Sequence, residues 1–557
     1  MIDIDSWIEH DPDEATRQEL IALKQKADGG DADAQAEIAD RFSGPLEFGT
    51  AGLRGAMGGG PFRMNRAVVR KAAAGLVEFL QDKVGRDALI VIGYDARHNS
   101  RDFALDTAAV ATAAGARALI YPRYLPTPLL AWAVRYLDAD AGVMVTASHN
   151  PPKDNGYKVY LGGRVVDEDG RGVQIVPPHD SEIAEKIAAT PPADEIPVAS
   201  TGWSLIDESV VEAYLERTRS LIPPEHSSDL KIVHTSMHGV GGETMMKVLK
   251  DAGFTNVHEV EEQAQPDPDF PTVSFPNPEE PGALDLAIEK AKKVGADLVI
   301  ANDPDADRCS IAIPTSTGWR QLNGDEIGSV LGEQIAKIGA ITGGTFASSV
   351  VSSRLLKEIA GRHGIAHATT LTGFKWIARA PQIIFGYEEA IGFCVDPEGV
   401  KDKDGITAGL LFAYIAAQLK TRGQTVEDQL DHLAQTHGVY LTAPVTIRVS
   451  DLSLMPATMA HLRAHSPETL AGSAVTSVSD LSEGTPGLPP TDAIILLNEL
   501  GDRAVVRPSG TEPKVKCYLE VIEPVATTVQ AAREAASKRM SQLQKDMSAA
   551  LALPSDS

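Results

Sequence analysis

Cysteine is scarce in this 557-residue chain, which has only Cys309, Cys394 and Cys517, far apart and without CxxC spacing. So few thiols exclude a disulfide framework and a thiolate metal site, and they predict a reducing, cytoplasmic location. Long apolar runs are also missing, since no stretch reaches the roughly 18 consecutive apolar residues of a membrane-spanning helix. The first ten residues are acidic and lack the apolar segment of a signal peptide. We therefore expect a soluble protein that is not exported.

Positive charge is in short supply, because 51 lysines and arginines face 77 aspartates and glutamates, a formal charge of -26. Such a chain repels nucleic acids and anionic membrane surfaces, so we expect neither as a partner. An anionic small molecule would need a locally basic pocket. The composition is that of an ordinary globular protein, with 43% hydrophobic and 23% charged residues. At roughly 150 residues per domain, the length predicts three to four domains.

Short apolar strands alternate with amphipathic helices along most of the chain, a pattern typical of α/β domains. The predicted strands here cover 88–93, 118–121, 142–146, 231–234 and 296–301, and the helices cover 68–80, 103–114, 209–221, 242–252, 283–294, 324–337 and 405–420. After residue 443, strands at 445–448, 493–496, 504–506 and 514–519 accompany two long helices, which indicates an α+β unit. We predict a helical arm at 1–42 and domains at 43–205, 206–317, 318–440 and 441–557. Within the arm, residues 13 to about 42 are rich in helix formers and are interrupted by Gly29-Gly30-Asp31, which predicts two short helices.

Residues 146–160, TASHNPPKDNGYKVY, place one serine in a turn-rich, basic segment directly after a predicted strand. The runs NPP and DNG are strong turn formers, so we expect Ser148 to be exposed on a loop. Lys153 and Lys158 would compensate the charge of a phosphorylated serine. The competing interpretation is a solvated turn with two surface lysines. His149 does not decide between them, because neighbouring side chains generally diverge and adjacency does not establish a Ser–His dyad.

Residues 303–308, DPDADR, follow an apolar strand and carry a carboxylate at every second position. Three oxygen ligands spaced in this way can converge on a hard cation such as Mg²⁺. An EF-hand would need glycine at its sixth position and glutamate at its twelfth, where this chain has Arg308 and Pro314. The Asp-x-Asp, apolar, Thr pattern of haloacid-dehalogenase nucleophiles is absent as well. The remaining alternative is a solvated acidic turn.

Two later segments carry groups suited to a sugar phosphate. The run GYEEAIG at 386–392 puts Glu388 and Glu389 at the end of an apolar strand, where carboxylates can accept hydrogen bonds from sugar hydroxyls. The run RPSGTEPK at 507–514 combines a guanidinium, two hydroxyls and a tight turn, which together suit a phosphate clamp. The alternatives are ordinary surface charge for the glutamates and a plain hairpin turn for the second run.

Basic residues elsewhere give weaker signals. Arg54 lies in the glycine-dense run GTAGLRG at 49–55, where the backbone can approach a ligand closely and the guanidinium can bind phosphate. That run matches neither the P-loop nor the Rossmann fingerprint. Arg97 follows Asp95 in a loop, and Lys375 lies in the run TGFKW. For these two residues the default interpretation is surface charge.

The four runs at 146–158, 303–308, 387–392 and 507–511, in this order, resemble the α-D-phosphohexomutase superfamily, the phosphoglucomutases and phosphomannomutases. The length, the helical arm and the runs GTAGLRG and TGFKW look most like the longer branch that includes phosphopentomutase-type enzymes. The resemblance covers nearly the whole chain. It implies a heart-shaped molecule of four domains, three α/β with mixed sheets and a C-terminal α+β domain.

The resemblance also implies catalytic roles. Ser148 would be the phosphoserine that donates and regains the phosphoryl group, and Lys158 the general acid/base. Arg54 and Arg308 would neutralise charge near the transferring group. A phosphoserine oxygen would complete a Mg²⁺ site made by Asp303, Asp305 and Asp307.

The same resemblance implies where the sugar phosphate binds. Glu388 would read the sugar hydroxyls, with Glu389 and Lys375 beside it in the substrate site. The phosphate that is not being transferred would be clamped by Arg507, Ser509, Gly510 and Thr511. Lys153, His149 and Arg97 are further candidates for the site.

The expected activity is the reversible conversion of glucose 1-phosphate and glucose 6-phosphate, with glucose 1,6-bisphosphate as the priming activator and a monomer or dimer as the active form. Two residues depart from the better-known hexose enzymes. Pro304 separates the first two aspartates and need not supply a ligand, whereas Ala390 replaces the serine of the usual Glu-x-Ser sugar loop. A phosphomannomutase or a phosphopentomutase with the same chemistry is therefore the alternative, and a non-catalytic sugar-phosphate sensor a more remote one.

Overall fold

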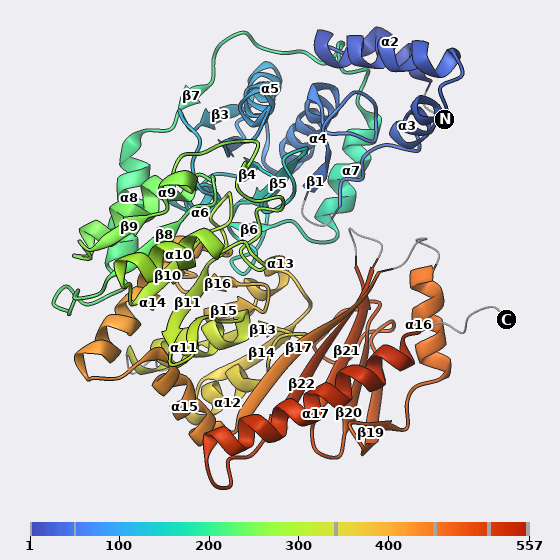
Figure 1. Cartoon of the computed structure of the whole chain (residues 1–557). Helices are drawn as coiled ribbons and strands as arrows, with labels where there is room; N and C mark the ends of the chain where they lie inside the picture. The colour runs from blue at the N-terminus through green and yellow to red at the C-terminus, as the bar shows by residue number, and fades with distance from the viewer. Residues whose placement is uncertain (1–2, 50–51, 339–342, 449–453, 510–513, 553–557) are drawn as a thin grey trace. The chain divides into compact units, whose positions relative to one another are not determined.

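The computed structural model describes residues 3–49, 52–338, 343–448, 454–509 and 514–552. The chain divides into two compact units, one made by Met1–Leu322 with Ile391–Gln418 and the other by Asn323–Ala390 with Leu419–Ser557. Figure 1 follows the chain through both units by colour, from the N-terminal helices to the C-terminal helix. Each unit is described below by itself.

The first unit opens with three short helices that form the N-terminal arm: α1 (Ile4–His10), α2 (Glu14–Asp28) and α3 (Ala32–Arg41). An aspartate side chain caps the N-terminus of each, since Asp3, Asp13 and Asp31 accept hydrogen bonds from backbone amides of the first turn. The sequence predicted the second and third helices and missed the first. Each helix of the arm therefore begins directly after an aspartate that caps it.

A mixed sheet of seven strands follows, in the order β1-β5-β4-β2-β3-β7, with β6 paired to β5. Its strands are β1 (Gly52–Ala56), β2 (Leu89–Tyr94), β3 (Arg117–Ile120), β4 (Ala141–Val145), β5 (Asp154–Leu161), β6 (Val173–Gln174) and β7 (Ser204–Leu205). Every residue of β2 and β4 is buried, as expected for central strands covered on both faces. The accompanying helices are α4 (Arg66–Val84), α5 (Ser100–Ala113), α6 (Thr127–Tyr136) and α7 (His179–Ala189).

The first unit contains a second sheet of five strands, in the order β12-β11-β10-β8-β9. Its strands are β8 (Ile232–Thr235), β9 (Val257–Glu259), β10 (Leu298–Ala301), β11 (Ser310–Thr315) and β12 (Gly318–Gln321). The helices here are α8 (Glu208–Arg219), α9 (Gly241–Asp251), the 3₁₀ turn η1 (Glu261–Gln263) and α10 (Asp285–Val294). Strand β16 (Gly392–Cys394) and the start of α14 (Gly405–Thr421) return to this unit, where Gly392 bridges Arg308. Residues 84 positions apart thus meet just beyond the end of β10.

The second unit holds a parallel group, β14-β13-β15, and an antiparallel sheet of six strands in the order β17-β22-β21-β20-β19-β18. The strands are β13 (Thr345–Ser349), β14 (Ala366–Thr370), β15 (Ile383–Glu388), β17 (Val439–Arg448), β18 (Thr469–Leu470), β19 (Ser473–Asp480), β20 (Ile494–Asn498), β21 (Arg503–Pro508) and β22 (Lys514–Glu523). The helices are α11 (Gly324–Ile338), α12 (Leu355–Arg362), α13 (Phe374–Ile377), α15 (Val426–His437), α16 (Leu454–Ala464) and α17 (Val529–Ala550). Buried apolar residues recur every three to four positions along α17, so one face packs on the antiparallel sheet.

The predicted fold class is confirmed: α/β parts with mixed sheets precede a C-terminal part with an antiparallel sheet. One local prediction was wrong, because residues 154–156 begin strand β5 and form no turn. Strand β5 pairs with β1 on one side and β4 on the other, and these ladders outweigh the turn preference of Asp-Asn-Gly. The three cysteines are buried free thiols. Within the described ranges, no helix is long and apolar enough to cross a membrane.

Candidate active site

The serine of the 146–160 run lies in the short connection between β4 and β5, and it is buried rather than exposed as the sequence predicted. Ser148 is only 3% exposed, and its φ of 51° lies in the left-handed region. That backbone conformation costs a non-glycine residue about 1–3 kcal/mol, and such strain is frequent at functional sites. The Ser148 amide donates to Thr146 Oγ1 at 2.9 Å. The surrounding structure therefore holds this serine in one strained conformation.

Three aspartates cluster directly after β10. Asp303, Asp305 and Asp307 are each fully buried, and one carboxylate oxygen of each lies within 4.8 Å of the others. The Ser148 hydroxyl donates a hydrogen bond of 2.8 Å to Asp303 Oδ2. Burial, reinforced by Asp305 and Asp307, raises the pKa of Asp303 well above its usual range. The loop and the serine therefore belong to one buried acidic site.

Two lysines face these carboxylates. Lys158 lies on β5 and places Nζ 2.7 Å from Asp305 Oδ2 and 2.8 Å from Asp307 Oδ2. Burial opposes its charge, but the two aspartates outweigh burial and raise the pKa of Lys158, so the amine is protonated. Lys403 Nζ lies 3.0 Å from Asp307 Oδ2. The sequence identified Lys158 as a candidate and missed Lys403, whose only local signal is the alternating run KDKD just before α14.

Thr127 is a second residue that sequence reasoning missed. Its Oγ1 donates to Asp305 Oδ2 at 2.5 Å, and its amide donates to the Asp305 carbonyl at 2.9 Å. Thr127 begins α6, so Asp305 lies at the N-terminal end of a helix, where the helix dipole favours negative charge. The contact spans 178 positions, and no local pattern announces it.

The acidic cluster fits a hard divalent cation. Its donors are carboxylate oxygens, which suit Mg²⁺ better than softer metals. Among the described residues, Asp305 Oδ1 and Asp307 Oδ1 are buried and accept no hydrogen bond, which is costly unless a cation takes them as ligands. The two lysines bind Asp305 and Asp307, and the raised pKa of Asp303 shows that a third negative charge is unfavourable here without a further cation. A metal with the serine oxygen as a further ligand would satisfy both needs.

Arg97 was predicted to be surface charge, and that prediction was wrong. The residue is 4% exposed, and its guanidinium donates to the carbonyls of Ser148 and Asn150, each at 2.6 Å. The reason is the irregular backbone between β4 and β5, where the carbonyls of Ser148 and Asn150 lie outside the sheet ladders and accept from the guanidinium instead. Arg97 therefore stabilises the backbone on which Ser148 lies.

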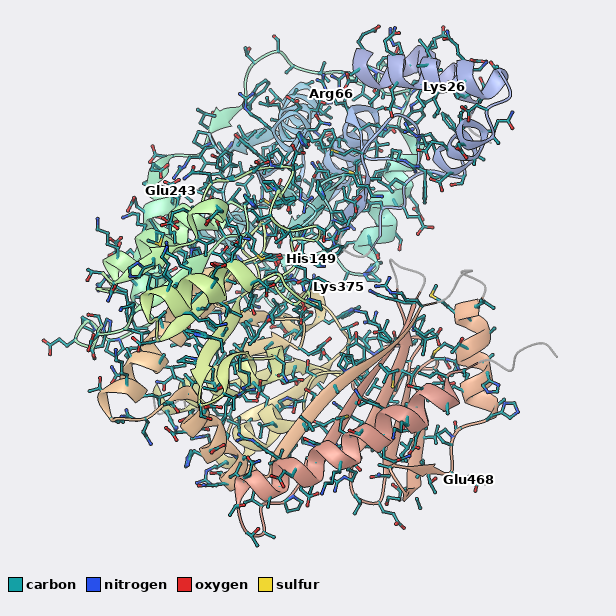
Figure 2. The ribbon with its side chains drawn as sticks, in the orientation of Figure 1. Lys26, Arg66, His149, Glu243, Lys375 and Glu468 are labelled. Atoms are coloured by element: carbon teal, nitrogen blue, oxygen red, sulfur yellow. The ribbon has the colours of Figure 1, made fainter. Side chains whose placement is uncertain are left out.

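The side chain of His149 does not diverge from that of Ser148 as expected. Figure 2 labels His149, whose Nδ1 lies 3.4 Å from Ser148 Oγ, a long contact permitted by the left-handed backbone at Ser148. Burial, with Arg308 and Arg54 adding positive charge, lowers the pKa of His149 well below its usual value. The imidazole is therefore neutral at neutral pH.

The other basic candidates of the first unit lie around the serine loop. Arg54 is exposed on β1, with Nη1 3.4 Å from Asn150 Oδ1. Arg308 is half-buried, and its Nη1 lies 3.7 Å from Glu279 Oε2. Lys153 is exposed. The structure thus brings Ser148, Lys158, the aspartates and the two arginines into one unit, with Lys153 at the surface.

The second unit carries the sugar and phosphate candidates. Glu388 ends β15 as predicted, and Glu389 accepts hydrogen bonds from the hydroxyls of Ser349 at 3.1 Å and Ser352 at 3.0 Å. Burial, together with Glu388 and Asp325, raises the pKa of Glu389 to about 7. Lys375 (Figure 2) is half-buried on α13.

The predicted phosphate clamp is only partly described. Arg507 lies near the end of β21 and is half-buried, as is Ser509. Gly510 and Thr511 lie outside the described residues. In the described part, β21 (Arg503–Pro508) ends one residue before Ser509.

Family models match this chain in four consecutive pieces. They are the phosphoglucomutase/phosphomannomutase α/β/α domains I, II and III, at 45–193, 212–318 and 323–437, and the C-terminal domain of the same family at 467–537. The solved structure of a phosphoglucomutase from Paramecium has a TM-score of 0.68 at 20% identity, covering 91% of this chain and 95% of that one. That likeness shows a shared fold.

Sequence relatives cover most of the chain. A protein of Haemophilus influenzae named "Probable phosphomannomutase" is 46% identical over 461 residues, 82% of this chain and 93% of its own length. A phosphoglucomutase of Staphylococcus haemolyticus is 35% identical, covering 86% of this chain and 91% of its own. The human phosphopentomutase is 33% identical, covering 93% and 90%. The chain belongs to the phosphoglucomutase/phosphomannomutase family and is a phosphosugar mutase, an enzyme of the isomerase class.

Proposed function

We propose that this enzyme is a phosphoglucomutase, which interconverts glucose 1-phosphate and glucose 6-phosphate through a phosphoserine at position 148 and a glucose 1,6-bisphosphate intermediate. The observation that carries the proposal is the buried hydrogen bond of 2.8 Å between Ser148 Oγ and Asp303. Next to it, the carboxylates of Asp305 and Asp307 bind Lys158. A protein that only bound sugar phosphate would need neither a strained serine nor a protonated amine at this place. The combination supports phosphoryl transfer.

The reaction has two transfers of the same kind. In the first, the P–Oγ bond of phosphoserine 148 breaks as a bond forms between phosphorus and the sugar O6, and the O6 proton ends on Ser148 Oγ. In the second, the phosphate on the sugar O1 passes to Ser148 in the same way, which regenerates the phosphoenzyme. Between the two, the bisphosphate must turn around without leaving, so a closed site is needed for retention.

The residues of the first unit divide the chemical work. Lys158 would carry the proton between the sugar hydroxyl and Ser148 Oγ, since its amine lies in the same acidic cluster as the serine's acceptor. Arg54 and Arg308 would neutralise the equatorial oxygens of the transferring group. Mg²⁺ held by the three aspartates would supply further charge stabilisation to those oxygens. Lys403 would hold Asp307 in place.

The residues of the second unit would recognise the substrate. Glu388, with Glu389 and Lys375, would bind sugar hydroxyls and phosphate, because their carboxylates and amine lie at strand and helix ends. Arg507, Ser509, Gly510 and Thr511 would hold the phosphate that stays on the sugar. We retain 43–205, 206–317, 318–440 and 441–557 as the proposed domain boundaries.

A phosphomannomutase or a phosphopentomutase is the second candidate. Ala390 lacks the hydroxyl of the usual Glu-x-Ser sugar loop, which favours a changed contact with the sugar. Relatives named as mannose and pentose enzymes cover more than four fifths of this chain, so the same chemistry on another sugar has support. The chemistry at Ser148 would be the same in each case.

One assay separates these candidates. We expect kcat/KM to be highest for glucose 1-phosphate among glucose, mannose and ribose 1-phosphates, measured with Mg²⁺ and glucose 1,6-bisphosphate. Ser148→Ala should abolish turnover with all three sugars, and the exposed serine variant Ser541→Ala should match the wild type. A higher kcat/KM on mannose or ribose would reassign the substrate, and a fully active Ser148→Ala enzyme would sink the phosphoserine mechanism.

A further inference from the structure

The guanidinium of Arg97 donates hydrogen bonds to the backbone of the serine loop, residues 146–153 between β4 and β5. Its Nη2 donates to the carbonyls of Ser148 and Asn150, each at 2.6 Å. Its Nη1 donates to the carbonyls of Pro151 at 2.8 Å and Asp154 at 3.2 Å. One side chain thus holds four carbonyls between Ser148 and Asp154, the first residue of β5. None of these contacts involves a group that reacts.

The carbonyls of residues 148, 150 and 151 precede β5 and lie outside the strands, so no sheet ladder provides their donors. A guanidinium supplies five donors in a rigid plane, whereas a lysine amine is a point charge that cannot span four acceptors. Because the side chain is buried, water does not replace it easily. The Pro151 carbonyl also accepts from the Asp154 amide at 3.0 Å, and the Lys153 carbonyl accepts from the Met57 amide at 2.8 Å. The guanidinium of Arg97 is the side-chain group that ties four of these carbonyls to one point.

Arg97 is itself held from two sides. Its amide donates to Asp95 Oδ1 at 3.0 Å, and its Nε lies 3.4 Å from Asp95 Oδ2. Asp95 Oδ1 also accepts from Ser100 Oγ at 2.6 Å, which ties it to the start of α5. On the other side, the guanidinium lies 4.9 Å from the centre of the Phe270 ring, within cation–π range. The guanidinium has little freedom to move.

We infer that Arg97 is a positioning residue for phosphoryl transfer, which sets the backbone of Ser148 so that Oγ points at Asp303. Three restraints fix Ser148: its amide on Thr146, its carbonyl on Arg97 and its hydroxyl on Asp303. Of the three, the Arg97 restraint also continues along the loop, to the carbonyls of Asn150, Pro151 and Asp154. The inference rests on the proposed role of Ser148, and it assigns Arg97 no contact with the substrate.

The test compares Arg97→Lys, which keeps the charge and loses the fork, with the wild type. The control is Arg117→Lys, which changes an exposed arginine on β3. We expect Arg97→Lys to lower kcat about 100-fold, because a displacement of about 1 Å at a reacting group can cost that much. KM for the sugar phosphate should stay within about threefold, since Arg97 does not bind it. Arg117→Lys should match the wild type in both constants.

The phosphorylation of Ser148 separates this inference from the proposed function. We would mix each enzyme with glucose 1,6-bisphosphate in a single turnover and follow the phosphoryl group on Ser148 by mass spectrometry. If the wild type is never labelled, the proposed function fails. If the wild type is labelled and Arg97→Lys is labelled at the same rate, the role of Arg97 fails. A slowing of labelling that matches the fall in kcat supports it.

A second variant keeps the test decisive if Arg97→Lys does not fold. Asp95→Asn has the same shape and removes the charge that orients Nε of Arg97. We expect a loss in kcat of about tenfold, smaller than for Arg97→Lys, with KM unchanged. A kcat within twofold of the wild type in folded Asp95→Asn would overturn the inference.

Discussion

The serine and aspartate loops of the first unit and the residues of the second unit proposed to bind sugar and phosphate differ in how deeply their described side chains are buried. Ser148, Lys158 and the three aspartates are each no more than 5% exposed and are joined by hydrogen bonds of 2.7–2.8 Å. Glu388 and Arg507 are half-buried at strand ends. The groups proposed to react are enclosed in protein, whereas Glu388 and Arg507, two of the residues proposed to recognise the substrate, are partly open.

This difference follows from the two tasks. Charge stabilisation in phosphoryl transfer depends on groups that are already in place and need no reorganisation. Recognition has to accommodate two orientations of one bisphosphate, so open side chains at loop ends suit it better. The comparison predicts that changes in the first unit mainly lower kcat and changes in the second unit mainly alter KM or sugar preference.

The largest effect is expected at the acidic cluster. Asp305→Asn keeps the shape and the bond to Thr127 but removes one charge from the proposed metal site, so kcat/KM should fall by at least about 1,000-fold. Chelation of divalent metal should also abolish the wild-type activity, and added Mg²⁺ should restore it. The exposed Asp33→Asn is the control. Activity that survives both Asp305→Asn and chelation would contradict the role of the cluster.

A smaller effect is expected at the phosphate clamp. Arg507→Lys should raise KM for the sugar phosphate about tenfold and leave kcat within about threefold, because a lysine cannot make the paired hydrogen bonds of a guanidinium. Steady-state kinetics measures both constants, with Arg422→Lys, an exposed arginine of the same unit, as the control. A fall in kcat with constant KM would place Arg507 with the reacting groups. It would contradict the prediction that changes in the second unit mainly alter KM.

The sugar loop should give a smaller effect still. Ala390→Ser restores the hydroxyl of the Glu-x-Ser pattern, and we expect the ratio of kcat/KM between glucose and mannose 1-phosphates to change by about tenfold or less. The sugar panel with wild type and variant checks this. An unchanged ratio would show that position 390 does not read the sugar.

The smallest effect concerns stability. The pKa of Glu389 is raised to about 7 in the folded protein, so folding binds a proton there between about pH 4.5 and 7. The stabilisation is complete below that range and is lost as pH rises through about 7, at a cost of about 2 kcal/mol after allowance for partial exposure. Glu389→Gln should therefore lose less Tm than the wild type between pH 6 and 8. Glu468→Gln, at an exposed glutamate labelled in Figure 2, should behave like the wild type. An equal dependence of Tm on pH in all three proteins would refute the raised pKa of Glu389.

Much of the fold was predictable because its signals are local. The apolar run before Asp303 and the alternating carboxylates that begin there predicted an acidic loop at the end of a buried strand. Strand β10 does end at Ala301. The helices α2 and α3 of the arm were predicted from composition and the Gly29-Gly30 break. Hydrophobic periodicity and turn residues act over a few positions, so predictions from them do not require knowledge of the tertiary structure.

The rest of the site depends on contacts that no local pattern contains. Lys403 meets Asp307 because β16 brings residues near 392 back to Arg308, and Thr127 meets Asp305 because a helix begins there. Ser148 was expected on an exposed turn, yet its loop is enclosed by Arg97 and by the ladders of β5. Local turn preference was correct for residues near 150 and wrong for residues 154–156, where pairing on both sides prevailed.

The central claim is that Ser148 carries the phosphoryl group between the two positions of the sugar. The most direct measurement is mass spectrometry of the purified enzyme after incubation with glucose 1,6-bisphosphate and Mg²⁺, followed by a chase with glucose 1-phosphate. We predict one phosphoryl group on the peptide that contains Ser148, lost during the chase, and none in Ser148→Ala. A peptide that stays unmodified while the wild-type enzyme turns over would contradict the account.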